Sequence, residues 1–233
     1  MQGSAVLLSG GLDSAVLLAD EAADHDVQPL YVSVGLSWEA AERRMISALL
    51  EHTPVAGHVR GLVPLTIDMR DVYSSAHWAL QGRPPGYHTP DEDVYLAGRN
   101  IVLLAKAALY CASAGIHRIV LGTLAHNPFP DATPEFRASM AQALSLGLDH
   151  AIEIAAPFAE VSKADVIRRG AARGVPFDLT LSCMNPRDNE TDGMPQHCGA
   201  CSKCRERHDA FLEAGVVDTT SYADRSNVIG RLG

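Results

Sequence analysis

Residues 9–14 of this 233-residue chain read SGGLDS, and this stretch is its strongest fold signal. It follows the apolar run Ala5–Leu8, which predicts a buried strand, and precedes Ala15–Ala19, which predicts a helix. Two consecutive glycines let backbone N–H groups converge, and the helix start adds the positive end of its dipole. The segment therefore predicts a phosphate-binding turn, with an ordinary capped strand-to-helix turn as the alternative. Its expected binding residues are Ser9, Gly10, Gly11, Leu12, Asp13 and Ser14.

The rest of the chain alternates strand-like apolar runs with helical patterns. The expected strands are Ala5–Leu8, Leu30–Val34, Val63–Ile67, Ile119–Gly122 and Ile152–Ala155. The expected helices are Ser14–Ala23, Glu39–Leu50, Ile101–Ala114, Glu135–Leu146, Lys163–Arg173 and Lys203–Ala214. This alternation predicts an α/β fold with a doubly wound, mostly parallel sheet. Ligands bind such sheets beyond the carboxyl ends of the strands, which is where the SGGLDS turn falls.

The bulk composition is that of an ordinary globular chain. Hydrophobic residues make up 47% and charged residues 20%. No apolar run approaches the roughly 20 residues of a membrane span, and the first residues carry no signal-peptide pattern, so we expect a cytoplasmic protein. A net charge of −9 disfavours a long nucleic-acid partner, which requires a basic surface, and favours a small-molecule substrate.

Four cysteines near the end of the chain have the spacing C-x14-C-x2-C-x2-C. A tetrahedral Zn²⁺ takes four thiolates with no open position, so the spacing predicts a structural zinc knuckle and not a catalytic metal. An iron–sulfur cluster and a redox-active cysteine pair are the alternatives. The expected ligands are Cys183, Cys198, Cys201 and Cys204.

The expected organisation is an α/β domain over residues 1–178, on which a zinc-knuckle and helical segment over residues 179–233 packs. Within it, Cys111 is expected in the core, because it lies in an apolar helical stretch. His197 is expected at the surface, since four cysteines already complete a zinc site. The loop Gln81–Asp93 is rich in proline, glycine and acids, and it is interpreted as a lid over the site or a solvated insertion.

The SGGLDS stretch lacks the Gly-Lys-Ser/Thr of a Walker A loop and the spacing of a dinucleotide fingerprint. It resembles the PP-loop of the N-type ATP pyrophosphatases, which cleave ATP between the α and β phosphates. Together with the four-cysteine knuckle, it makes the chain resemble the 7-cyano-7-deazaguanine synthases nearly end to end. Further segments similar to that family are Gly98–Asn100, Phe129–Asp131, Pro134–Phe136, Ser162–Asp165 and Leu181–Cys183.

The resemblance implies an ATP-dependent C–N ligase. That family converts 7-carboxy-7-deazaguanine and ammonia to 7-cyano-7-deazaguanine through an acyl adenylate and an amide, in queuosine and deazapurine biosynthesis. It implies ATP, Mg²⁺, a structural Zn²⁺ and small-molecule partners, and members of that family are often homodimers. The apolar runs and the net charge give the further expectation of no membrane partner and no nucleic acid. Catalysis would consist mainly of positioning and charge neutralisation, without a nucleophilic side chain.

The expected catalytic residues are Asp13, Arg99 and Lys163, and the expected substrate residues are Arg99, Asn100 and Asp131. Asp13 would contact pyrophosphate-bound Mg²⁺ or cap the helix. Arg99 suits a phosphate or carboxylate as a planar bidentate donor, and Asn100 would cap the helix beside it. Asp131 would accept from a guanine-like edge, and Lys163 at a helix start would meet a phosphate. The alternatives are a solvated arginine, a turn aspartate and an exposed lysine.

Two segments depart from the family pattern. The family carries Tyr-Gly-Gln-Arg-His where Val34–Trp38 reads VGLSW, followed by Glu39 and Glu42, and Ala125–Phe129 replaces a longer acidic stretch. These departures leave open an enzyme that stops at the amide, joins the carboxylate to another amine, or adenylates a similar acid. A PP-loop tRNA-modifying enzyme and a non-catalytic binding protein are the remaining alternatives.

Overall fold

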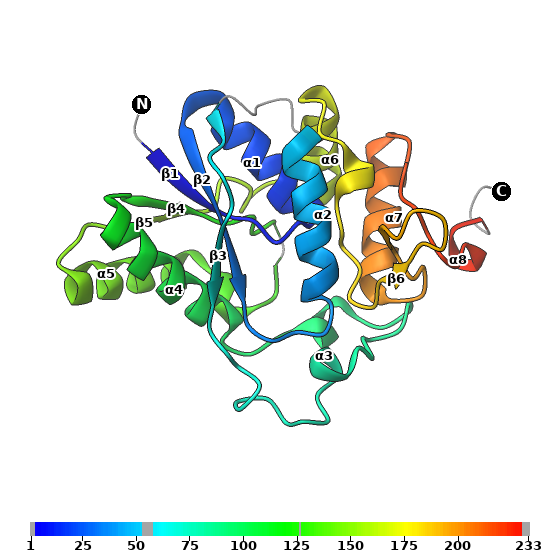
Figure 1. Cartoon of the computed structure of the whole chain (residues 1–233), viewed down its shortest axis with the longest axis horizontal. Coiled ribbons are helices and arrows are strands. Elements are labelled where there is room, and N and C mark those ends of the chain that lie inside the picture. The colour runs from blue at the N-terminus through cyan, green and yellow to red at the C-terminus, as the bar shows by residue number, and fades with distance from the viewer. Residues whose placement is uncertain (1–2, 53–57, 126, 230–233) are drawn as a thin grey trace.

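A five-stranded parallel sheet forms the centre of the fold in the computed structural model, which describes residues 3–52, 58–125 and 127–229. The strands lie in the order β3-β2-β1-β4-β5, and each neighbouring pair is parallel (Figure 1). Their bounds are β1 Gly3–Leu7, β2 Asp26–Ser33, β3 Val63–Thr66, β4 Arg118–Val120 and β5 Glu153–Ala155. The chain builds the sheet outward from β1 first on one side and then on the other. The predicted doubly wound α/β class is therefore confirmed.

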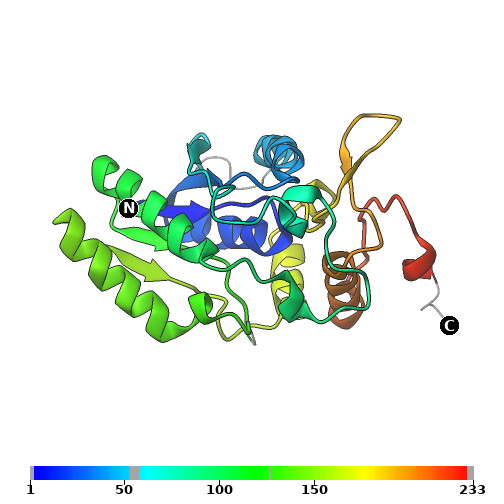
Figure 2. The ribbon, with the colours of Figure 1, turned by 90° about the horizontal axis from the view of Figure 1, so that it is seen from below.

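Helices cover both faces of this sheet. The main ones are α1 Leu12–Asp24, α2 Glu39–His52, α4 Arg99–Ala114, α5 Pro134–Leu148, α6 Lys163–Ala172 and α7 Ser202–Ala214. Successive residues of β1 point to opposite faces, so that Val6 lies in the core formed with α1, α2, α6 and α7, and Ala5 in the core formed with α4 and α5. Figures 1 and 2 show α4 and α5 side by side on their face of the sheet.

The remaining elements are short and were not predicted, because so few residues show no period. They are α3 Trp78–Gln81, α8 Ser226–Ile229, the hairpin strands β6 Arg187–Asp188 and β7 Pro195–Gln196, and the 3-10 turns η2 Asp91–Val94, η3 Pro130–Ala132 and η4 Phe177–Leu179. The predicted strands and long helices all overlap observed elements, with shifted ends. For example, β2 starts before the predicted Leu30 because Asp26 to Pro29 pair with Gly3 to Val6 of β1. Within this stretch, buried Gln28 donates its side-chain amide to the carbonyl of Gly61 at 2.7 Å.

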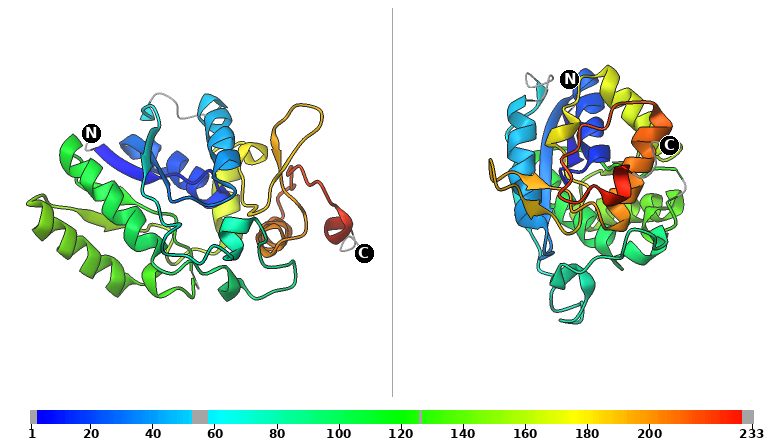
Figure 3. Two further views of the ribbon diagram at one scale, coloured as in Figure 1. Left: turned by 60° about the horizontal axis from the view of Figure 1, so that its bottom comes forward. Right: turned by 90° about the vertical axis from the view of Figure 1, so that its right-hand side faces the viewer.

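The C-terminal segment shares the core of the sheet domain. Phe211 of α7 packs edge-to-face on Phe177 with ring centroids 5.2 Å apart, and both belong to the cluster that contains Val6. Figure 3 shows α7, α8 and the β6–β7 hairpin gathered at one end of the molecule, away from α5. The boundary at residue 178 stays a prediction, and one hydrophobic core spans both sides of it.

The helices of the described residues are short relative to a bilayer. None of them has the length and apolar content needed to cross a membrane.

Candidate functional site

A cavity of about 280 Å³ opens at the carboxyl ends of β1, β2 and β4. It lies where the strand order changes direction, between β1 and β4, which is the usual ligand position in such sheets. Its polar lining comes from the turn after β1, the start of α4 and the segment after β4. Its lining residues include Ser9, Gly11, Asp13, Ser14, Tyr31, Glu42, Tyr95, Arg99, Asn100, Thr123, Asn127, Phe129 and Asp131.

The SGGLDS turn brings four of its six residues to this cavity, namely Ser9, Gly11, Asp13 and Ser14. The Ser14 hydroxyl donates to the carbonyl of Gly11 at 2.9 Å, and no side chain caps the start of α1. The first N–H groups of the helix are therefore free of a side-chain acceptor, as an anion site requires. Gly10 and Leu12 are not among the residues that line the cavity. A Cβ on Gly10, where φ is +77°, would come within 2.9 Å of Ile46 Cγ1.

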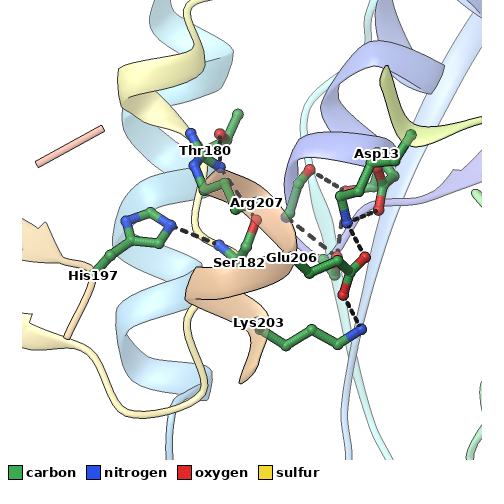
Figure 4. Close-up of polar contacts among 11 residues, drawn as sticks. Asp13, Thr180, Ser182, His197, Lys203, Glu206 and Arg207 are labelled. Atoms are coloured by element: carbon green, nitrogen blue, oxygen red, sulfur yellow. Dashed lines mark hydrogen bonds and ion pairs between the residues drawn. The ribbon is translucent and has the colours of Figure 1, made fainter. Parts of the chain in front are cut away.

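Asp13 is joined to a charged row that continues to α6 and α7 (Figure 4). Its Oδ2 lies 3.2 Å from Lys163 Nζ, which also pairs with Glu206, and Glu206 pairs in turn with Lys203. Burial disfavours the charge of Lys163, but Asp13 and Glu206 outweigh it and hold the pKa of the ammonium above its usual value. Burial likewise opposes the charge of Glu206, whose pKa the two lysines nevertheless lower to about 2.

This row changes the interpretation of two predicted residues. Asp13 does not cap α1, so that alternative is wrong; its Oδ1 is buried and has no hydrogen-bond partner among the described residues. Lys163 lies at the start of α6, as predicted, but its ammonium forms ion pairs with the carboxylates of Asp13 and Glu206. It is not among the residues that line the cavity. A contact between Lys163 and phosphate stays a prediction.

Arg99, Asn100 and Asp131 meet at the start of α4, and all three line the cavity. The backbone N–H of Asn100 donates to Asp131 Oδ2 at 3.0 Å, and the Asn100 side chain donates to the Asp131 carbonyl at 3.0 Å. Asp131 thus supplies the acceptor at this helix start, and the prediction that Asn100 caps the helix is wrong. Arg99 Nε is buried without a hydrogen-bond partner in the described parts of the chain. A buried guanidinium edge facing a cavity fits an anionic ligand.

Helix α2, which follows the segment Val34–Trp38, contributes a third acidic group to the cavity, after Asp13 and Asp131. The carboxylate of Glu39 is occupied within its own segment, because it accepts hydrogen bonds from the Ser33 hydroxyl and from the N–H groups of Val34 and Gly35. Glu42 lines the cavity and accepts from Tyr31 Oη at 2.8 Å and from Trp38 Nε1 at 3.1 Å. Burial raises the pKa of Glu42 to about 7, although the nearby Arg99 opposes that shift.

Two aromatic rings form part of the same wall. Tyr95 and Phe129 stack with centroids 5.0 Å apart and planes inclined by 23°. Phe129 and Asn127 belong to the second departing segment, in which His126 lies outside the described residues. Flat apolar faces beside polar groups suit a heteroaromatic ligand.

The loop Gln81–Asp93 does not line the cavity; the residues that do are Val94, Tyr95 and Leu96, which follow it. Arg205 of α7 fixes the loop by donating to the carbonyls of Tyr87 and Thr89 at 2.9 and 2.8 Å. The interpretation of this loop as a lid is therefore wrong for the observed structure, because its hydrogen bonds tie it to the C-terminal segment.

The four predicted cysteine ligands converge. Cys183, Cys198, Cys201 and Cys204 are all buried, and their Sγ atoms lie within 4.8 Å of one another. Backbone N–H groups of Asn185 and Cys198 point at Cys183 Sγ, at 3.3 and 3.2 Å, which favours a thiolate there. None of the described cysteines forms a disulfide. Four buried sulfurs at these separations fit a tetrahedral metal ion.

Two further predictions concern residues near this cluster and in α4. Cys111 is fully buried in α4, as predicted. His197 is only 2% exposed, so its predicted surface position is wrong. Its Nε2 accepts from the backbone N–H of Ser182 at 3.0 Å (Figure 4), and burial lowers the pKa of the ring.

With this geometry in view, comparison with known proteins defines the family. The model of the queuosine biosynthesis protein QueC matches residues 3–215, and the chain therefore belongs to the QueC family. A 7-cyano-7-deazaguanine synthase of Anaeromyxobacter dehalogenans is 34% identical over 94% of this chain and 94% of its own. One from Methanopyrus kandleri is 33% identical over 96% of this chain and its full length.

Solved structures give a weaker likeness. A 4-thiouridine synthetase in complex with RNA and ATP covers 92% of this chain and 51% of its own, with 12% identity and a TM-score of 0.49. That similarity carries no argument about function.

Proposed function

We propose that this protein is an ATP-dependent synthase that converts 7-carboxy-7-deazaguanine and an amine, with ammonia as the expected one, to the amide and then to 7-cyano-7-deazaguanine. Family membership supports this proposal. The observation that carries it is one cavity that joins an uncapped helix start to Asp13 and Arg99. Such a cavity can hold a polyphosphate and a carboxylate together.

In this proposal the phosphates of ATP lie at the start of α1, where backbone N–H groups and the Ser9 and Ser14 hydroxyls surround them. Asp13 offers its free Oδ1 to a pyrophosphate-bound Mg²⁺, and Lys163 holds Asp13 in place from behind. Arg99 faces the acid and neutralises charge as the adenylate forms.

The reaction needs no nucleophilic side chain. A substrate carboxylate oxygen attacks the α-phosphorus of ATP, and pyrophosphate leaves. An amine nitrogen attacks the resulting acyl adenylate, and AMP leaves. The amide oxygen then attacks the α-phosphorus of a second ATP, and pyrophosphate leaves. Loss of both N–H protons to water and departure of the second AMP give the nitrile. Asp131 and the stacked rings of Tyr95 and Phe129 are proposed to hold the heteroaromatic part of the acid.

We also propose that the four-cysteine cluster binds a structural Zn²⁺. Four buried thiols leave no open coordination position, and zinc is the usual ion for such a donor set. The proposed partners are small molecules, and the net charge of −9 disfavours nucleic acid. A homodimer stays an expectation from the family resemblance.

The test is product analysis. The protein is incubated with ATP, Mg²⁺, ammonia and 7-carboxy-7-deazaguanine, and the mixture is analysed by mass spectrometry. We expect the amide first and the nitrile later, with AMP and pyrophosphate. If the amide accumulates and no nitrile forms, the proposal would be restricted to the formation of the amide. The absence of both products, with ATP intact, would refute the substrate assignment.

A further inference from the structure

Glu42 occupies an unusual position for a carboxylate. It lines the cavity, yet its side chain is fixed by two donors from different elements, Tyr31 Oη at 2.8 Å and Trp38 Nε1 at 3.1 Å. Trp38 is itself held by a parallel stack on Trp78, with ring centroids 5.8 Å apart. The carboxylate is therefore preorganised before any ligand arrives.

The other carboxylates that line the cavity already have another partner or another proposed task. Asp13 pairs with Lys163 through Oδ2 and is left with Oδ1 for the proposed Mg²⁺, and Asp131 Oδ2 accepts from the N–H of Asn100 at the start of α4. Glu39, which lies beside the cavity, is saturated by three donors from its own segment. Glu42 receives only neutral donors and no cation, since no ion pair joins it to a lysine or arginine within the described residues.

Arg99 places a positive charge near the Glu42 carboxylate. It lines the same cavity, and its positive charge is the strongest influence opposing protonation of Glu42. The other groups against Glu42 are Tyr31 from β2, Trp38 and Glu39. Arg43 acts on Tyr31, with its guanidinium 6.0 Å from the Tyr31 ring centroid. Among the described residues, the cavity is lined by a guanidinium with an unpartnered Nε and by a carboxylate without an ion-paired cation, which together suit an acid and an amine.

We propose that Glu42 is the amine-receiving carboxylate of this enzyme: it binds the ammonium form of the attacking amine and takes one proton from it. This inference rests on the proposed function, because it needs an acyl adenylate for the amine to attack. It assigns a role to the segment Val34–Trp38, which brings Trp38 to Glu42 and departs from the family pattern.

The protons balance as follows for ammonia. The ammonium ion gives one proton to the Glu42 carboxylate and becomes ammonia. Its nitrogen forms a bond to the acyl carbon, the C–O bond to AMP breaks with its electron pair on the phosphate, and a second N–H proton passes to water. Glu42 then releases its proton to water. A carboxylate with a pKa of about 7 can both accept and release a proton at neutral pH.

The test separates adenylation from amine attack. Adenylation is measured alone as acid-dependent ATP–pyrophosphate exchange, and amine attack is measured with ammonia and with hydroxylamine. Hydroxylamine is largely uncharged at neutral pH, so it needs no base to release its lone pair. The variant is Glu42→Gln, which keeps the side-chain size, and the matched control is Glu51→Gln, an exposed residue of the same helix.

We expect Glu42→Gln to retain exchange and hydroxamate formation and to lose about 100-fold in kcat/KM for ammonia. Glu51→Gln should retain all three activities. An unchanged ammonia rate in Glu42→Gln, or equal losses with ammonia and hydroxylamine, would overturn the proposal. Loss of exchange in Glu42→Gln would also overturn it, because the residue would then act before the amine. Absence of exchange in the wild-type protein would instead refute the proposed function, and this inference with it.

A second variant covers the case in which Glu42→Gln does not fold. Tyr31→Phe removes a hydrogen bond that lowers the pKa of Glu42, so that pKa should rise. Because the ionised carboxylate is required, the acidic limb of the ammonia-dependent rate should begin near pH 7 in the wild type and move to higher pH in Tyr31→Phe. The pH profile with hydroxylamine should not move. Coincident profiles for the variant and the wild type with ammonia would overturn the proposal.

Discussion

Replacing Lys163 with methionine removes a buried charge while keeping most of the side-chain length. Lys163 bridges Asp13 and Glu206, and the three side chains are only 14%, 26% and 21% exposed. Removing one partner of a buried ion pair costs about 3–5 kcal/mol, because the other charge is left without compensation. Lys203 still pairs with Glu206 in the variant, which places the expected loss near the lower end, at about 3 kcal/mol.

The assay is equilibrium unfolding in guanidinium chloride, with a thermal melt in parallel. For a chain of this size the expected loss lowers Tm by roughly 6–12 °C. The control is Arg44→Met, which removes the exposed pair between Arg44 and Asp188 and should cost less than about 1 kcal/mol. A loss below about 1 kcal/mol for Lys163→Met would refute the reasoning, since the charged row would then behave like surface ion pairs.

Four further predictions follow from the same contacts. Asp13→Ala should reduce acid-dependent ATP–pyrophosphate exchange by about 100-fold or more with an unchanged circular dichroism spectrum, and an active variant would exclude a role in binding pyrophosphate. Cys201→Ser should lose bound zinc and speed amide exchange in the C-terminal segment; retention of one zinc per chain would contradict the knuckle. Gly199→Ala should destabilise by about 2 kcal/mol or more in the same unfolding assay, because its Cβ would lie 1.8 Å from the Asp224 carbonyl oxygen at a φ of +78°, and a neutral effect would exclude that clash. The stabilisation from Glu206 should be complete above the ordinary carboxyl pKa and be lost as the pH falls toward about 2. In Lys163→Met, which raises that folded-state pKa, the loss should be smaller and should end at a higher pH; superimposable acid-unfolding curves would contradict this.

Local signals in the sequence predicted the parts of the site that lie within one short segment. The glycines of SGGLDS and the apolar runs around them specify strand, turn and helix together, and the structure shows all three. The cysteine spacing predicted the four-cysteine cluster for a similar reason, since three of the four ligands fall within seven residues, Cys198–Cys204.

Contacts between distant segments explain what was missed. Lys163 meets Asp13 from 150 positions away, so its carboxylate partners left no sequence signal. Asp131 accepts from the N–H of Asn100, 31 residues earlier, at the start of α4. Asn100 was predicted as the cap because only its position near the helix start is readable in the sequence. His197 looked like a surface residue, but the chain after α7 returns to cover it, with Tyr222 against its ring.

Glu42 combines one contact within its own segment with contacts to distant segments. Its spacing of four residues from Trp38 was readable as a helical contact, but the hydroxyl of Tyr31 and the charge of Arg99 come from other elements. The sequence therefore indicated that this region departs from its family without indicating what the departure does.

The central claim is that this cavity activates a carboxylate by attack on the α-phosphorus of ATP. The most direct measurement uses 7-carboxy-7-deazaguanine with ¹⁸O in its carboxylate and follows the label by mass spectrometry of AMP in the presence of ammonia. We predict one ¹⁸O atom in the AMP released with each amide. Unlabelled AMP, or label that appears in inorganic phosphate with ADP as the product, would contradict the claim.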